Sequence, residues 1–206
     1  MTRPAPRWLP ILAALLTGAV LFAVGRVHGA GLFAEGGVVE AATAGLLAAA
    51  GSAALVLRRP WAGTALVLLA LRELDLDKRA VSEGILKLRQ YSGDAPLGEK
   101  IAGLLVIALI LAILWRFARA LPSVLRAARR ETWARLVLLA FALVVVAKTL
   151  DGLARKLAGI GVEISAEAAA RAPAFEESLE LLFGACLLWA VLAYRTSPCP
   201  PSNPPA

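Results

Sequence analysis

The sequence predicts an all-α, polytopic transmembrane helical bundle of about six helices, with short amphipathic helices at the membrane interface. Of its 206 residues, 59% are hydrophobic and 18% are charged, whereas soluble domains carry about 25% charged residues. Six apolar stretches approach the roughly 20 residues of a bilayer crossing, near 8–25, 37–57, 61–77, 100–118, 132–151 and 176–194. We therefore expect one transmembrane domain over 1–195 and a disordered, proline-rich tail over 196–206.

The stretches differ in how cleanly they end. The first follows Arg3 and Arg7; it is long for the apolar part of a cleaved signal peptide, so we expect it to remain as a span. The third, fifth and sixth are interrupted or preceded by Arg72, Lys148 and Glu180. These three helices must continue through charged residues to cross a hydrocarbon core of about 30 Å.

Three connections have helical periodicity. Apolar residues recur opposite charged ones between Lys78 and Ser92, and again after the fifth span at Leu153, Leu157 and Ile160, which predicts helices lying in the interface. The stretch from Arg119 to Arg135 is basic and amphipathic, so we expect it to rest on anionic headgroups.

The formal net charge of +7 does not indicate a nucleic-acid partner, because the basic residues flank apolar segments and form no stripe with interleaved aromatics. Topology explains the excess better. Eleven of the 22 basic residues lie on each side of the predicted topology. The segments on the side of the N-terminus are short and contain one acid, Glu131, whereas those on the other side are longer and contain several acids, which favours a cytoplasmic location for the former. We expect a multi-pass protein of a bacterial-type inner (plasma) membrane, with both termini cytoplasmic.

With this topology, ionisable residues of several helices gather on the extracytoplasmic side, where the helices enter the bilayer. A charged side chain facing lipid costs a few kcal/mol, so such groups normally face the bundle interior and pair with one another. The candidate ligand-binding residues are Glu40, Arg72, Glu73, Asp75, Lys148, Asp151, Glu176, Glu177 and Glu180.

Spacing supports this convergence, because Glu176 and Glu180 are four residues apart and share one helical face. Glu40 continues into Ala44, Ala48 and Ser52, a small-residue stripe that permits close helix packing. The fourth stretch, Ile101 to Leu114, has no charge and suits a lipid-facing position.

Several chemistries fit such a group. Oxygen ligands suit a hard divalent cation such as calcium, magnesium or manganese, for which the predicted ligands are Glu40, Glu73, Asp77 and Glu177. Clustered carboxylates also suit a proton relay, and the neighbouring lysines and arginines suit a polar lipid headgroup. The simpler alternative is that these charges are interfacial anchors and structural ion pairs.

Three functions follow. The first is a binding or transport component whose cluster holds a cation or a polar lipid headgroup. The second is a membrane-embedded enzyme acting on a lipid or isoprenoid substrate, although no nucleophile with a partner base stands out in the sequence. The third is a structural subunit that docks a membrane partner or another copy of the chain.

Overall fold

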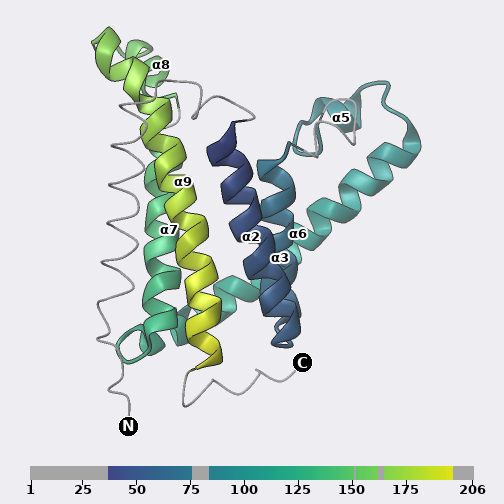
Figure 1. The fold of residues 1–206 in the computed structure, drawn as a ribbon. Coiled ribbons are helices and arrows are strands. Elements are labelled where there is room, and N and C mark those ends of the chain that lie inside the picture. The colour runs from purple at the N-terminus through teal and green to yellow at the C-terminus, as the bar shows by residue number, and fades with distance from the viewer. Residues whose placement is uncertain (1–36, 76–83, 151, 162–164, 197–206) are drawn as a thin grey trace.

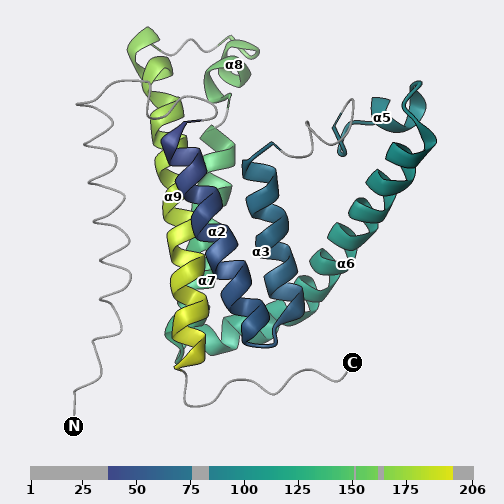
Figure 2. The same cartoon turned by 45° about the vertical axis from the view of Figure 1, so that its right-hand side comes forward.

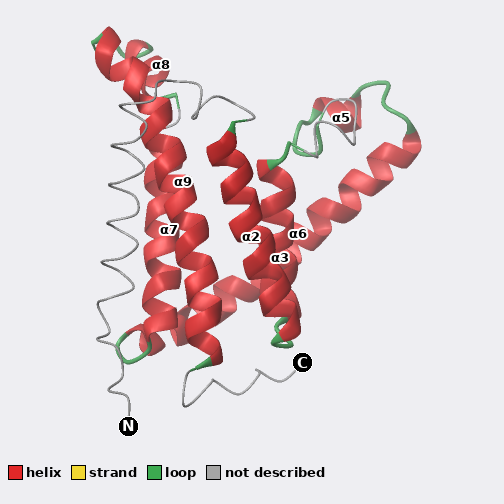
Figure 3. Cartoon of the chain, viewed as in Figure 1, coloured by secondary structure: helices red, strands yellow, loops and turns green. Residues whose placement is uncertain are grey.

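The structure, a computed structural model, describes residues 37–75, 84–150, 152–161 and 165–196. These residues form helices joined by loops and contain no strand (Figures 1 and 3). The helices are α2 (Val38–Val56), α3 (Pro60–Glu73), α5 (Arg89–Ser92), α6 (Leu97–Ala128), α7 (Thr132–Leu150), α8 (Leu153–Ala158) and α9 (Ala166–Arg195). The all-α class predicted from the sequence is therefore confirmed for the described residues.

α2 and α3 form an antiparallel hairpin closed by a tight turn. At its end, Arg58 adopts a left-handed conformation with φ 55°. The N–H of Arg59 donates to the carbonyl oxygen of Ala54, and that of Arg58 to Leu55, each at 2.9 Å. This pair of bonds is the Schellman arrangement, which satisfies carbonyls that a helix end leaves open. Pro60 then starts α3, where its missing N–H costs nothing.

Two glycines let the hairpin helices touch. A Cβ on Gly63 would lie 2.5 Å from Leu55 Cγ and 3.0 Å from the carbonyl oxygen of Gly51. A Cβ on Gly51 would lie 2.9 Å from Val67 Cγ2. The backbones of α2 and α3 therefore pack at a distance that larger residues would prevent.

α9 packs against both α2 and α7, so that α3, α2, α9 and α7 lie side by side in that order (Figures 1 and 2). Their shared core is rich in alanine, which brings the helices close together. Its buried members are Leu47, Ala50, Ala54, Leu66, Ala70, Leu136, Ala140, Leu182, Phe183, Cys186 and Ala190.

α6 is inclined to these four helices and diverges from α3 towards the end that carries α5 (Figure 2). Its apolar side chains are largely exposed, including Leu104, Leu105 and Leu111. This exposure agrees with the lipid-facing position predicted for the uncharged stretch.

Four of the described helical segments are long and apolar enough to cross a membrane: Val38–Val56, Leu97–Ala128, Thr132–Leu150 and Ala170–Arg195. By length and composition, the described part of the chain thus has four helices that could span a membrane, and a count of about six spans stays a prediction. The predicted first span, 8–25, lies outside the described residues. α3 has 14 residues and is about 21 Å long at 1.5 Å per residue, short of a full crossing.

Several predicted helix ends were wrong. In the region of the third stretch, α3 already ends at Glu73, and Asp75 adopts a left-handed conformation with φ 50°. The fourth stretch does not end near 118, since α6 runs for 32 residues through Pro122 to Ala128. The sixth begins ten residues earlier than predicted, at Ala166. The added segments of α6 and α9 are rich in alanine and carry some charged residues. Alanine has the highest helix propensity.

The small-residue stripe on α2 was also misplaced. Ala44 is buried, but Ala48 and Ser52 are exposed. The face that packs inside the bundle carries Thr43, Leu47 and other buried residues instead.

The predicted interfacial helices are short. In the described part of 78–92, helix is confined to α5, which has four residues, and residues 78–83 lie outside the described part. α8 spans six residues after Gly152. The described part of this connection begins at Gly84, which has φ 90°.

Candidate functional site

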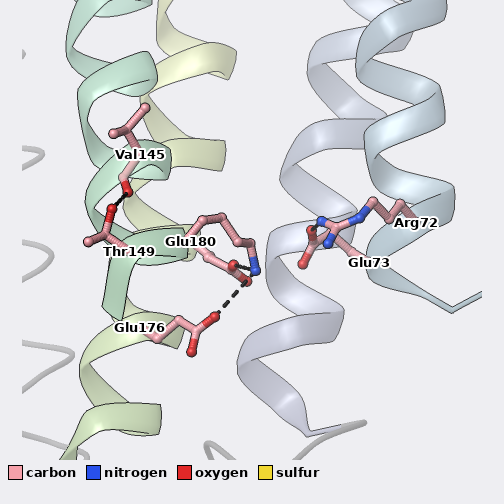
Figure 4. Close-up of polar contacts among 7 residues, drawn as sticks. Arg72, Glu73, Val145, Thr149, Glu176 and Glu180 are labelled. Carbon is pink, nitrogen blue, oxygen red and sulfur yellow. Dashed lines mark hydrogen bonds and ion pairs between the residues drawn. The ribbon is translucent and has the colours of Figure 1, made fainter. Parts of the chain in front are cut away.

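The described candidate residues come from four helices whose ends meet at one end of the bundle. Glu40 lies in the first turn of α2, Glu73 is the last residue of α3, and Lys148 lies in the last turn of α7. Glu176, Glu177 and Glu180 lie where α9 passes the end of α7 (Figures 1 and 4). We call this end, defined by these residues, the carboxylate end; its location agrees with the level expected from alternating helix directions.

Lys148 joins α7 to α9 through two carboxylates. Its Nζ lies 2.5 Å from Oε1 of Glu180 and 3.3 Å from Oε1 of Glu176 (Figure 4). The Glu180 side chain is 8% exposed and that of Lys148 39% exposed. Because the two glutamates are four residues apart, one ammonium group reaches both from the same helical face.

A second ion pair lies across the bundle on α3. Arg72 Nη1 is 3.6 Å from Oε1 of Glu73, whose side chain is 11% exposed. Glu73 also interacts electrostatically with Glu180, Lys148 and Glu40. In Figure 4, Glu73 points towards Glu180. Together with Glu40 of α2, the ion pairs on α3, α7 and α9 therefore form one electrostatic unit over four helices.

Glu177 is the member of this unit whose charge is least compensated. Its Oε2 is buried and, among the described residues, has no hydrogen-bond partner. The charges that act on it come from Glu180, Glu40, Glu176 and Glu73, all of them acids. A proton or a cation would stabilise this half-buried carboxylate, because a buried, unpaired negative charge beside other acids is unfavourable.

The hydroxyl groups of Thr43 and Ser178 donate their hydrogen bonds to main-chain carbonyl oxygens and not to the carboxylates. Thr43 Oγ1 donates to the carbonyl oxygen of Val39 at 3.0 Å, and Ser178 Oγ to that of Ala174 at 2.7 Å. Both hydroxyls are therefore used within their own helices.

Among the described residues of the carboxylate end, the five glutamates exceed Arg72 and Lys148 by three formal charges, or −3 if every one of these groups is ionised. We call these five, Glu40, Glu73, Glu176, Glu177 and Glu180, the carboxylate cluster. An excess of negative charge in a partly buried site attracts cations and repels anions.

Of the three other predicted site residues, one belongs to the described part of the chain. Asp75 lies beyond the end of α3, in the left-handed turn. Asp151 and Asp77 lie outside the described residues. Among the residues that the structure describes, no group of three or more His, Cys, Asp or Glu side chains is arranged to hold a metal ion, so the four-ligand metal site stays a prediction.

The opposite end of the bundle contains contacts that the sequence did not reveal. Tyr194 on α9 stacks edge-on against Trp133 of α7, with ring centroids 5.4 Å apart. Arg59 lies over the Tyr194 ring, 4.8 Å from its centroid, and hydrogen-bonds its hydroxyl. The sequence signal for these contacts is an arginine next to a tyrosine or tryptophan near a helix end.

No protein-family model, no curated protein and no solved structure matches this chain.

Proposed function

We propose that this chain is a small membrane protein whose carboxylate cluster binds a cation, as a binding or transport component. The observation that carries this proposal is the buried Oε2 of Glu177, which is surrounded by acids and lacks a hydrogen-bond partner among the described residues. A cation bound at this position would balance the negative charge of the Glu177 carboxylate. Calcium, magnesium and manganese are the divalent ions that prefer oxygen ligands.

The charge balance favours a cation over an anionic headgroup. In the described part of the chain, Arg72 and Lys148 form ion pairs with glutamates of the cluster. A phosphate there would meet surplus carboxylates. A lipid amine, such as that of phosphatidylethanolamine, carries the same kind of charge as a metal ion and is the second source of this ligand chemistry.

The arginines at the other end of the bundle favour one orientation of the chain in the membrane. The turn at 58–59, the stretch 116–135 and residue 195 together carry nine arginines and one acid, Glu131. Short connections rich in arginine favour the cytoplasmic side. In this orientation the carboxylate cluster faces the outside of a bacterial-type inner membrane.

The decisive variant is Glu177→Gln, which keeps the shape of the side chain and removes its charge. The purified chain in neutral detergent is heated at increasing concentrations of calcium, magnesium, manganese or sodium chloride, at constant ionic strength. We expect one cation to raise the melting temperature of the wild type; a ligand at about 100 times its Kd adds about 2.7 kcal/mol to stability. Glu177→Gln should lose this stabilisation.

Glu167→Gln is the matched control, because Glu167 lies on the same helix with a 74% exposed side chain. It should behave like the wild type. A parallel series with phosphatidylethanolamine or phosphatidylcholine in place of the salts separates a lipid amine from a free ion. A wild-type melting temperature that no cation and no amine lipid changes would contradict the proposal.

The enzyme and structural-subunit alternatives stay predictions. An enzyme would lose turnover in Glu177→Gln and keep ion-dependent stabilisation, and a structural subunit would lose its co-purifying partner instead.

A further inference from the structure

The end of the bundle opposite the carboxylate cluster is a surface of arginines. Here the α2–α3 turn, the second half of α6, the α6–α7 turn and the last turn of α9 come together (Figure 2). We call this the arginine end; its members are Arg58, Arg59, Arg116, Arg119, Arg126, Arg129, Arg130, Arg135 and Arg195. We propose that the arginine end binds the headgroups of anionic phospholipids, with the second half of α6, from Arg116 onwards, seated in the membrane interface.

The partners of these arginines differ from those of the basic residues at the other end. Arg116 lies over the ring of Trp61 and Arg119 over that of Trp115, 4.8 and 6.0 Å from the centroids. Aromatic faces hold a guanidinium group in place without neutralising its charge. The positive charge therefore remains available to an external anion.

Uncharged oxygen atoms orient two further arginines, again without neutralising their charge. Arg135 donates from Nε to the carbonyl oxygen of Ala128 at 2.7 Å, and from Nη2 to that of Arg129 at 3.0 Å. Arg126 donates to the carbonyl oxygen of Pro122 and to Ser123 Oγ, both at 3.2 Å. These acceptors carry no formal charge, so the excess positive charge of this end persists.

α6 adds an apolar stripe beside the arginines. Phe117, Leu121 and Leu125 recur every four residues and are 47, 48 and 50% exposed. At 3.6 residues per turn, Arg119 and Arg126 lie on the opposite side of the helix from this stripe. A helix with one exposed apolar side and one exposed arginine side suits the boundary between acyl chains and headgroups.

Charge complementarity identifies the occupant. Phosphate groups accept the forked hydrogen bonds of arginine, and each basic residue near an anionic membrane surface contributes about 1 kcal/mol. Phosphatidylglycerol presents a net negative charge, and phosphatidylcholine is neutral overall. This inference is independent of cation binding at the other end.

The test uses the full chain in phosphatidylcholine vesicles that contain a minor fraction of a lipid with brominated acyl chains, which quench nearby tryptophans. Trp61 and Trp115 lie directly beneath Arg116 and Arg119 and report on adjacent lipids. We expect brominated phosphatidylglycerol to quench the wild type more strongly than brominated phosphatidylcholine. Arg119→Gln/Arg126→Gln should reduce this preference by about fivefold or more.

The matched control is Arg89→Gln/Arg171→Gln, which removes two exposed arginines from the other half of the molecule and should leave the preference unchanged. Arg119→Lys/Arg126→Lys retains the charges and should keep most of it. Added salt should weaken the wild-type preference, because exposed charges are screened. Equal quenching of the wild type by both lipids, or a preference that persists in the double glutamine variant, would overturn the proposal.

Discussion

The two ends of the bundle bring charged residues to helix termini in opposite ways. At the carboxylate end, Lys148 and Arg72 are paired with glutamates of the same chain. At the arginine end, Arg116 and Arg119 rest on aromatic rings. The first end pairs Arg72 and Lys148 internally and keeps a surplus of carboxylates. At the second end, the positive charge of these arginines remains available to external anions.

Charged helix ends that look alike in the sequence can therefore differ in function. Both ends combine apolar helices with charged termini, and hydropathy alone treats them alike. The partner chemistry decides which end forms a buried site, because ion pairs draw helices together and cation–aromatic contacts leave the guanidinium exposed. We therefore expect substitutions at the carboxylate end to have the larger effect on stability.

Lys148→Met should have the largest effect. It leaves Glu176 and the buried Glu180 without their shared cation, and removing one partner of a buried ion pair costs about 3–5 kcal/mol. Because Lys148 is partly exposed, we expect a loss of about 2–3 kcal/mol. Unfolding by sodium dodecyl sulfate in mixed micelles, followed by circular dichroism, measures this free energy.

Two comparisons sharpen the Lys148 result. Arg72→Gln, at the same end but with a 55% exposed side chain, should change the free energy of unfolding by about 0.5 kcal/mol or less. The double variant Lys148→Met/Glu180→Gln should recover part of the loss, since it removes a buried charge together with its partner. Equal losses for Lys148→Met and Arg72→Gln would show that the Lys148 pair is not a buried link between α7 and α9.

Tyr194→Leu should have a smaller effect at the arginine end. It removes the edge-on contact with Trp133 and both contacts with Arg59. Such aromatic pairs contribute about 0.5–1.5 kcal/mol, and we expect a total loss of about 1–2 kcal/mol in the same unfolding measurement. Tyr194→Phe, which keeps the ring, should lose about 1 kcal/mol or less. A loss larger than that of Lys148→Met would reverse the proposed order of the two ends.

The sequence predicted the helical class and the shared level of the acids, because alternating helices return to the same membrane surface and hydrocarbon does not tolerate single charges. The four-residue spacing of Glu176 and Glu180 also predicted that they share one helical face, but it did not identify Lys148 of α7 as their common partner. These features depend on local periodicity, which a single sequence records well.

Other features depend on tertiary contacts and could not be predicted. The packed face of α2 is fixed by α3 and α9, and so Ala48 and Ser52 are exposed although they continue the pattern of Ala44. α3 ends early because Asp75 accepts a left-handed conformation, which aspartate tolerates better than most residues. The start of α9 at Ala166 was missed because hydropathy does not detect a helix of alanines and charges.

Direct cation binding to the purified chain is the most decisive measurement. Isothermal titration with calcium, magnesium and manganese chloride, in detergent free of chelators, should show saturable binding of one of these ions to the wild type and to Glu167→Gln. The same ion should not bind Glu177→Gln, in which the carboxylate surrounded by acids has become a neutral amide. Absence of binding to the wild type, or equal binding to Glu177→Gln, would contradict a cation site at the carboxylate end.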